Sequence, residues 1–395
     1  MQTFDWIVVG NGLAGAAASY ELARQGLAVL LVDQSLIPES ATRYSYGGIP
    51  HWSGTNSLTK QLCQEGIAKQ RQLTEELGAD TQFRELDLLL TVAPQADLDA
   101  LTAQFAKFAN PPQFLTVQEA HALEPQINPQ AIAGAFTVRH GHVSPMGLVQ
   151  AYNQAFQRLG GTLLIAPVRG LVRVGAKVTG LMTDEQAYPA QQVLVAAGAF
   201  SRRLLQDIGL AIPLYYTHAE LIETPPLDLT LRTLVMPANN QRFALEAKAS
   251  APAVDPLWNQ PGHEITPPIL DSGAIQFQDG HLCIGQISRT LTDVAAPVPA
   301  GESETAMRQA IGHLLPALAG VSGTWHRCLV SFSRDGLPLV GPLPGVNGLH
   351  LFTGFNSPFV YVPAIAQRFA HSAGAEADNW LAAMAPGRFP TVVQS

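Results

Sequence analysis

The first 33 residues contain two short apolar runs separated by one alanine-rich stretch. Phe4–Val9 and Ala28–Val32 are almost continuously apolar, which is typical of strands buried on both faces of a parallel sheet. Between them, Leu13–Gln25 places small and apolar residues at helical spacing and ends at Gly26, a common helix terminator. The pattern therefore predicts a strand–helix–strand unit at the start of the chain.

The apolar pattern then predicts further helices and strands. Helices are expected at Leu58–Leu77 and Asp97–Ala109, with a strand at Leu86–Val92 between them. A third helix begins at Ser144-Pro145, where serine is a favourable N-cap and proline suits the first turn, and it runs to about residue 159. Shorter apolar runs predict strands at Thr162–Ile165, Gly170–Val174, Val178–Met182 and Gln192–Ala197.

The turn between the first strand and the first helix has the spacing G-x-G-x-x-G. Gly10 permits the tight turn, Gly12 lets the backbone approach a diphosphate, and Gly15 lets the helix pack closely on the strand. The diphosphate would lie at the helix N-terminus, where free N–H groups favour negative charge. Asp33, at the end of the second strand, is placed to accept hydrogen bonds from a ribose. The unit predicts dinucleotide binding by Gly10, Gly12, Leu13, Ala14, Gly15 and Asp33; a glycine-rich turn without a ligand is the alternative.

The middle of the chain has a different pattern, because from Pro213 to about Ile287 strand follows strand between turn residues. A chain of 395 residues is also too long for one ordinary core. The predicted fold class is α/β plus α+β: a Rossmann-like nucleotide-binding domain with an inserted substrate domain whose sheet is mostly antiparallel. The predicted bounds are 1–84, 142–210 and 324–395 for the first domain, and 85–141 and 211–323 for the second.

Composition narrows the range of partners and locations. A net charge of −8 with scattered Lys and Arg offers no basic patch for nucleic acid. Gly336–Gln367 carries no charged residue, but its prolines and glycines exclude a membrane span, and we expect buried loop and strand around a ligand. Three dispersed cysteines and no leader-like N-terminus predict a cytoplasmic location. His140 and His142, on the approach to a helix, lack a third ligand cluster, so no metal site is predicted.

Three further motifs follow the glycine turn in order. His142-Val143-Ser144-Pro145 begins the predicted helix, Val193 to Ala199 is an apolar run ending in Ala-Gly-Ala, and Asp335 to Gly341 precedes Leu351 to Phe355. Together with the glycine turn they resemble the D-amino-acid oxidase superfamily of flavoproteins, which includes glycine, sarcosine and N-methyl-amino-acid oxidases. The resemblance implies FAD as the cofactor, with contacts from Val168, Ala197, Gly198, Asp335, Gly354, Phe355 and Asn356.

Two details resemble the sarcosine-oxidase branch. Thr42-Arg43 follows the second strand, and the resemblance implies that both contact the cofactor, with Arg43 beside the flavin ring to stabilise negative charge there; a surface-loop arginine is the alternative. Cys328 lies seven residues before Asp335, the spacing of a cysteine that is bonded covalently to the flavin in that branch. The preceding Trp325-His326-Arg327 segment is expected to lower the pKa of the thiol; a buried, unbonded cysteine is the alternative.

The sequence departs from these relatives where they bind a substrate carboxylate. Val330 replaces an arginine of the glycine-oxidase branch, and Tyr46 and Tyr361 replace an arginine and a lysine of the sarcosine branch. An oxygen-activating lysine is missing near Cys283, which leaves oxidase and dehydrogenase both open. Either another arginine binds a carboxylate, or the substrate is larger or less acidic than glycine. The candidate arginines are Arg242, Arg289, Arg327 and Arg334.

The resemblance implies oxidation of the C–N bond of an amine or amino acid to an imine, by hydride transfer to FAD and reoxidation by O2 or an electron carrier. Such catalysis depends on orientation and electrostatics more than on acid–base groups. The expected catalytic residues are Arg43, Gln286 and Tyr361, around a small-molecule amine substrate. The alternatives are oxidation of a C–OH bond in a hydroxy acid or polyol phosphate, and a flavin-binding scaffold without turnover.

Overall fold

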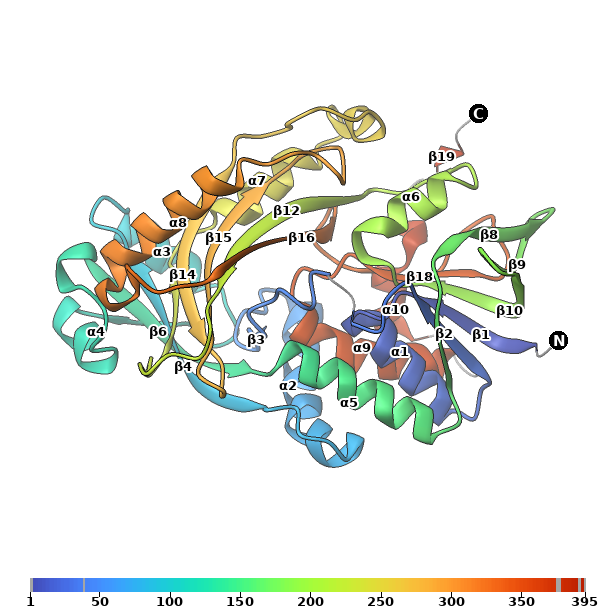
Figure 1. The fold of residues 1–395 in the computed structure, drawn as a ribbon, viewed down its shortest axis with the longest axis horizontal. Helices are drawn as coiled ribbons and strands as arrows, with labels where there is room; N and C mark the ends of the chain where they lie inside the picture. The colour runs from blue at the N-terminus through green and yellow to red at the C-terminus, as the bar shows by residue number, and fades with distance from the viewer. Residues whose placement is uncertain (1–2, 38–39, 374–377, 390–391, 394–395) are drawn as a thin grey trace.

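The computed structural model describes residues 3–37, 40–373, 378–389 and 392–393. Two sheets make up the frame of the protein (Figure 1). The sheet that contains the N-terminal strand lies to the right in Figure 1, and a larger sheet lies to the left. The predicted combination of a parallel sheet and a mostly antiparallel sheet is therefore confirmed.

The first sheet is parallel along most of its width. Its strands lie in the order β17-β18-β10-β1-β2-β7, and β17 alone of these runs antiparallel to its neighbour. Val8 in β1 pairs with Leu31 in β2 and Leu194 in β10, so apolar runs lie side by side in the middle of the sheet. The strands are β1 (Phe4–Val9), β2 (Val29–Asp33), β7 (Thr162–Ile165), β10 (Ala187–Val195), β17 (Leu339–Pro342) and β18 (Leu349–Thr353).

Helices cover one face of this sheet and a small hairpin covers the other. Figure 1 shows α1, α5 and α9 together beside the sheet, where their apolar side chains form the largest buried cluster. On the opposite face, β8 and β9 pair with the start of β10 over a second apolar cluster. The elements are α1 (Leu13–Arg24), α2 (Ser57–Leu77), α5 (Pro145–Arg158), α9 (Pro358–Ser372), β8 (Val168–Val174) and β9 (Lys177–Thr183).

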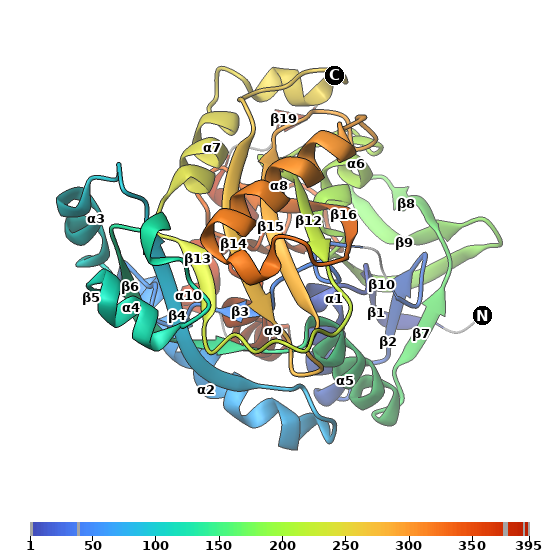
Figure 2. The ribbon, with the colours of Figure 1, turned by 60° about the vertical axis from the view of Figure 1, so that its left-hand side comes forward.

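The second sheet has its strands in the order β16-β12-β15-β14-β13-β4-β6-β3, with β5 on β6. Every pairing is antiparallel except that of β13 with β4. Figure 2 shows α8 (Ala300–Leu314) lying across β14, β15 and β12, so one face of the sheet is covered. The strands are β3 (Gly48–Ile49), β4 (Arg84–Val92), β5 (Gln113–Leu115), β6 (Gly134–His142), β12 (Leu214–Glu223), β13 (Leu234–Pro237), β14 (Ile269–Gln276), β15 (Leu282–Arg289) and β16 (Thr324–Ser333).

Most predicted elements are confirmed within a few residues, and Ser144 caps α5 as expected, its Oγ accepting a hydrogen bond from Gly147 N at 3.1 Å. The remaining α-helices and strands are short, and the two strands among them pair with each other as a separate small sheet. They are α3 (Leu98–Phe105), α4 (Val117–Leu123), α6 (Ser201–Gln206), α7 (Gln241–Ala249), α10 (Asn379–Met384), β11 (Leu210–Ala211) and β19 (Val392–Val393).

The charge-free segment Gly336–Gln367 contains a helix, which corrects the prediction of loop and strand. Helix α9 continues through Pro363, which has no N–H to donate to the carbonyl of Phe359. The side chain of Gln70, on α2, donates a hydrogen bond to that carbonyl instead, at 2.5 Å. A long-range side chain thus offsets the loss of one helical bond.

One other expectation differs from the structure, because helix α7 interrupts the predicted run of strands after Pro213. His140 and His142 lie at the end of strand β6, where they pair with β4, and the chain enters α5 three residues later, so they lie on the approach to a helix as expected. Strand β16 pairs with β12 along its whole length and so belongs to the second sheet, although its residues fall within the range predicted for the nucleotide-binding domain. The division into domains stays a prediction.

Because α2 and α9 pack closely at Gly66, adding one methyl group there should reduce the stability of the protein. A Cβ at Gly66 would lie 1.8 Å from the carbonyl oxygen of Val360, so Gly66→Ala should lower the free energy of unfolding by about 1–3 kcal/mol or more. A Cβ at Gly301, in α8, meets nothing within 4 Å, so Gly301→Ala is the matched control and should change stability by less than about 1 kcal/mol. Chemical denaturation measures both; equal midpoints for the two variants would contradict this packing.

Candidate functional site

A cavity of about 1500 Å³ extends from the first sheet to the second. Pockets for one small ligand usually enclose roughly 300–1,000 Å³. The cavity begins at the turn between β1 and α1, passes the ends of β10 and β18, and reaches the face of the second sheet that α8 does not cover. It therefore has room for a dinucleotide and a second molecule together.

The turn between β1 and α1 forms one end of the cavity. Gly10 has φ +106°, and a Cβ there would lie 2.7 Å from the carbonyl oxygen of Ala196. A Cβ at Gly15 would lie 1.7 Å from Gly10 O, so helix and strand approach as closely as the sequence predicts. Neither contact tolerates a side chain, and both glycines are required by the turn.

The polar groups of this turn suit an anion and a ribose. Gly12 is the N-cap of α1 and has no side chain to cap it. Leu13 N donates to Thr42 Oγ1 at 3.2 Å. Asp33 accepts from Asn11 N at 2.6 Å, and burial raises the pKa of its carboxyl. The remaining N–H groups of the first helical turn and the Asp33 carboxylate match the diphosphate and ribose of a bound dinucleotide.

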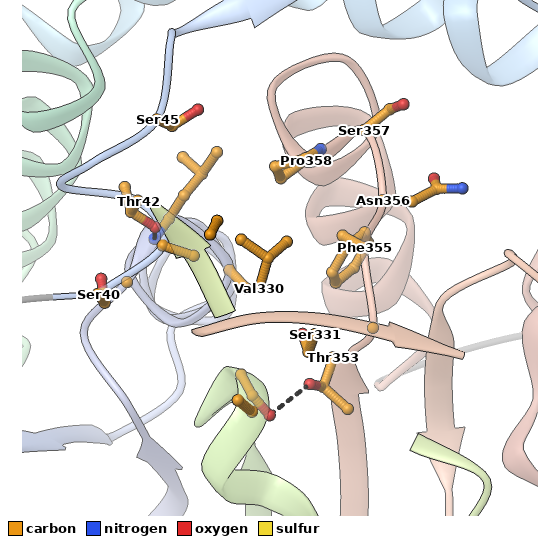
Figure 3. A pocket seen from close by; sticks show the side chains of 18 of the residues that line it. Ser40, Thr42, Ser45, Val330, Ser331, Thr353, Phe355, Asn356, Ser357 and Pro358 are labelled. Atoms are coloured by element: carbon orange, nitrogen blue, oxygen red, sulfur yellow. Dashed lines mark hydrogen bonds between the residues drawn. The ribbon is translucent and has the colours of Figure 1, made fainter. Parts of the chain in front are cut away.

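Most of the predicted cofactor residues meet at the cavity. Figure 3 shows Thr42 on one side and Phe355 and Asn356 on the other, with Val330 between them. Thr353 Oγ1 donates to Gly198 O at 3.3 Å and so connects the ends of β18 and β10 (Figure 3). The predicted residues that line the cavity are Gly10, Gly12, Leu13, Ala14, Asp33, Thr42, Val168, Ala197, Gly198, Cys328, Asp335, Gly354, Phe355 and Asn356.

Two predicted residues do not line it. Gly15 acts through the close packing described above. The guanidinium of Arg43 binds Glu223, at the end of β12, with Nη2 to Oε2 at 3.0 Å and Nη1 to Oε1 at 3.2 Å. A carboxylate 180 positions away in the sequence thus draws Arg43 away from the cavity. The role of Arg43 beside the flavin ring stays a prediction.

The second sheet forms the other end of the cavity, which we call the chamber. Ala219 pairs with Cys328, and side chains from β12, β15 and β16 share this face of the sheet. Gln286 lines the chamber and donates from Nε2 to Ser288 Oγ at 3.0 Å. Tyr361, on α9, lines the cavity where it meets the first sheet. The apolar side chains of the chamber wall include Leu88, Leu90, Leu221, Ile275 and Val330.

Cys328 lies in the cavity wall, but its surroundings differ from the expectation. Burial raises the pKa of its thiol to about 12, although the charge of Arg242 opposes this. Arg327 precedes Cys328 in β16 and therefore points to the other face of the strand, where it donates to the carbonyl of Ala296. The predicted lowering of the thiol pKa is wrong, because burial outweighs the positive charge nearby.

A buried pair in the chamber wall was missed by the sequence patterns. Trp52 Nε1 donates to His140 Nδ1 at 3.0 Å, and both residues line the cavity. Burial lowers the pKa of His140 to about 3, so the imidazole is neutral at physiological pH. The partners are 88 positions apart, and no local pattern indicates their contact.

Among the residues that the structure describes, no group of three or more His, Cys, Asp or Glu side chains could hold a metal ion. No helix in this part of the chain combines the length and apolar character needed to cross a bilayer.

The fold and the cavity are those of a dinucleotide-dependent enzyme, in which the nucleotide groove is continuous with the chamber. Residues 5–372 match the model of the DAO family, described as FAD dependent oxidoreductase. The chain belongs to this family of FAD-dependent oxidoreductases, which confirms the family and the cofactor that the sequence motifs predict.

Individual relatives agree with this assignment. Glycine oxidase of Pseudomonas aeruginosa is 28% identical over 381 residues, which cover 92% of this chain and 93% of that protein. One component of the anaerobic glycerol-3-phosphate dehydrogenase of Escherichia coli is 28% identical over 232 residues, covering 56% of this chain and 42% of that component. The crystal structure of glycine oxidase from Geobacillus kaustophilus superposes with a TM-score of 0.80 at 22% identity, covering 99% of this chain and 100% of that one. The last comparison shows a shared fold.

The nucleotide turn predicts that a side chain at residue 12 excludes FAD. A Cβ at Gly12 would meet only Thr42 Oγ1, at 3.2 Å, so Gly12→Val should fold while its side chain occupies the approach of the diphosphate. Gly170→Val, on β8, is the control, because a Cβ there meets nothing within 4 Å. The ratio of flavin absorbance to protein absorbance measures FAD content. Full FAD content in Gly12→Val would refute the position assigned to the diphosphate.

Proposed function

We propose that the protein oxidises the C–N bond of an amine or amino acid to an imine. The observation that carries this proposal is the continuity of the cavity: an apolar chamber with few polar groups opens directly onto the groove that suits FAD. Such a chamber can position a carbon–hydrogen bond beside FAD, which is what hydride transfer requires of the protein. Glycine oxidase of Pseudomonas aeruginosa, similar over nine-tenths of the chain, supports an amine as the reacting group.

The residues of the chain bind and orient the substrate in this proposal. FAD in the groove supplies the acceptor for the hydride that leaves the carbon next to nitrogen. Val330 and the apolar chamber wall hold the carbon skeleton, and Gln286 and Tyr361 offer uncharged polar groups near the reacting atoms. The amine also loses a proton to water, and water then hydrolyses the imine to a carbonyl compound and ammonia, or to a carbonyl compound and an amine where the nitrogen is substituted. O2 or an electron carrier reoxidises the flavin.

Oxidation of a C–OH bond is the second candidate. The similarity to the component of anaerobic glycerol-3-phosphate dehydrogenase supports it, but that similarity covers 56% of the chain. We further propose a cytoplasmic location, which the three unpaired, buried cysteines support, since reducing compartments keep thiols free.

Anaerobic mixing of the purified protein with candidate substrates tests the proposal. N-methyl, primary and cyclic amino acids and plain amines form one panel, and glycerol 3-phosphate and 2-hydroxy acids form the other. We expect bleaching of the flavin absorbance by members of the amine panel. Bleaching by the hydroxyl panel alone would establish the second candidate, and no bleaching by either panel would favour a scaffold without turnover.

The chamber also predicts the pH dependence of flavin reduction. Burial lowers the pKa of His140 to about 3 and raises the pKa of Cys328 to about 12. Burial raises the pKa of Tyr46 and of Tyr361 above the ordinary value as well. The histidine is neutral above its pKa and the thiol and phenols are neutral below theirs, so none titrates between about pH 5 and pH 10.

We therefore expect kcat/KM to rise with pH only as the substrate amine loses its proton, because the uncharged amine is the hydride donor. Profiles for two amines of different pKa should have midpoints that differ as those pKa values do. One midpoint near neutral pH, shared by both amines, would reveal a titrating group of the protein and contradict this description of the chamber.

The sequence resemblance implies covalent attachment of FAD through Cys328, but the burial of that thiol argues against it. With its pKa raised to about 12, the thiol is protonated at neutral pH and is a poor nucleophile. We therefore expect acid precipitation to release the flavin into the supernatant. Flavin that stays in the wild-type pellet, but not in the pellet of Cys328→Ser, would establish the thioether bond.

A further inference from the structure

The chamber contains a buried hydroxyl without a partner. Tyr46, in the segment between β2 and β3, lines the cavity, and its hydroxyl makes no hydrogen bond with any residue that the structure describes. Burial keeps the phenol protonated, because its pKa is well above the ordinary value. Leaving a buried hydroxyl without a partner is unfavourable, so the site favours a ligand that accepts a hydrogen bond there.

An arginine on helix α7 lines the same chamber. Arg242 donates from Nε to Glu246 Oε1, one helical turn further on, at 3.0 Å. Neither Nη1 nor Nη2 of Arg242 donates a hydrogen bond to a residue in the described ranges. Glu246 is only 6% exposed and holds one side of the guanidinium, which leaves the two terminal nitrogens for a planar acceptor.

Arg242 and Tyr46 belong to one cluster. Arg242, Tyr46 and Cys328 all line the cavity, and Tyr46 packs against the same apolar cluster as Met236, which lies six residues before Arg242. The charge of Arg242 opposes the effect of burial on the pKa of Tyr46 and of Cys328. Cys328 and Val330 are two residues apart in β16 and therefore share the face of the sheet toward the chamber. Arg242 thus lines the same cavity as Tyr46 and Val330, the positions at which the family resemblance led us to expect carboxylate partners.

The other candidate arginines are engaged elsewhere. Arg289 binds the buried carboxylate of Glu220, with Nε to Oε1 at 2.7 Å. Arg334 donates to Tyr215 at 2.8 Å and does not line the cavity. Arg327 lines the cavity, but it lies on the face of β16 opposite Cys328 and donates to the carbonyl of Ala296.

Two acidic side chains, Glu246 and Asp271, act on the charge of Arg242 but do not line the cavity. Glu246 orients the guanidinium, and Asp271 accepts a hydrogen bond from Asn239 Nδ2 at 3.0 Å. Both offset the positive charge of Arg242. The cluster therefore suits a singly charged, planar carboxylate held by hydrogen bonds, and it disfavours a phosphate dianion, which the two acids would repel.

We propose that Arg242 and Tyr46 bind the carboxylate of the substrate, which is an apolar amino acid larger than glycine. This inference rests on the proposed oxidation of an amine. The carboxylate accepts from the terminal nitrogens of Arg242 and from the Tyr46 hydroxyl, and the hydrocarbon part of the substrate lies against Leu88, Leu90, Leu221, Ile275 and Val330.

Binding of 4-methylpentanoate, an apolar carboxylate without an amine, tests the site without turnover. Calorimetric titration of the FAD-loaded protein measures its Kd, with 4-methylpentan-1-ol as the ligand that lacks the carboxylate. Arg242→Leu should weaken 4-methylpentanoate binding by about 10- to 100-fold and leave binding of the alcohol unchanged. Tyr46→Phe, which removes only the unpartnered oxygen, should weaken it by about 3- to 10-fold.

Arg327→Leu is the matched control, because it removes another cavity arginine and the same charge. Its Kd for 4-methylpentanoate should stay within about 3-fold of wild type. Equal FAD content and equal denaturation midpoints show that each variant is folded. Wild-type protein that does not bind 4-methylpentanoate, or Arg242→Leu that binds it as wild type does, would overturn the inference.

These outcomes are separate from those of the flavin-bleaching screen. Loss of carboxylate binding in Arg242→Leu with no bleaching by any amine would retain the carboxylate site and reject the proposed reaction. Bleaching by amines with carboxylate binding unaffected in Arg242→Leu would retain the reaction and reject the site.

Discussion

The structure depends on the close contact between the first strand and the first helix. Gly15 approaches the Gly10 carbonyl so closely that a Cβ would lie 1.7 Å from it, and Gly10 packs against the Ala196 carbonyl at the end of β10. These contacts fix the N-terminus of α1 over the carboxyl ends of the parallel strands. Ligands of open α/β sheets bind at this edge, because helix N-termini and strand ends meet there.

The chamber is built from parts of the chain that lie far apart in sequence but meet beside this edge. Thr353 Oγ1 donates to Gly198 O, which holds the ends of β18 and β10 together below the cavity (Figure 3). Strand β16 leaves the second sheet and enters the turn at Asp335, so residues of β16 face the cavity where the two sheets meet. The shape of the groove that would hold FAD and the shape of the chamber are therefore determined by the same strand ends.

Local sequence patterns predicted those features of the fold whose geometry depends on residues close together in the sequence. The glycine spacing, the apolar runs of β1 and β2, and the Ser144 cap of α5 each depend on residues within a few positions of one another. The features that these patterns missed depend on distant partners. Gln70 satisfies the carbonyl that Pro363 leaves free in α9, 289 positions away.

The candidate site likewise combines features set by neighbouring residues with features set by distant partners. The residues of the nucleotide turn were predictable, because the motif itself creates the geometry. The position of Arg43 was not, since it depends on Glu223, and the raised pKa of Cys328 depends on burial by the whole fold. For the proposed carboxylate site, the sequence offered four candidate arginines, and only the fold shows that Arg289, Arg327 and Arg334 are engaged by other groups.

In the proposed reaction, this cavity holds an amine so that its carbon–hydrogen bond faces FAD. The most direct measurement is the anaerobic rate of flavin bleaching by one amine substrate, unlabelled and with deuterium on the carbon next to nitrogen. We expect severalfold slower bleaching with deuterium at saturating substrate, because breaking that bond releases the hydride. Equal rates for the two substrates, with deuterium retained in the product, would contradict hydride transfer from that carbon.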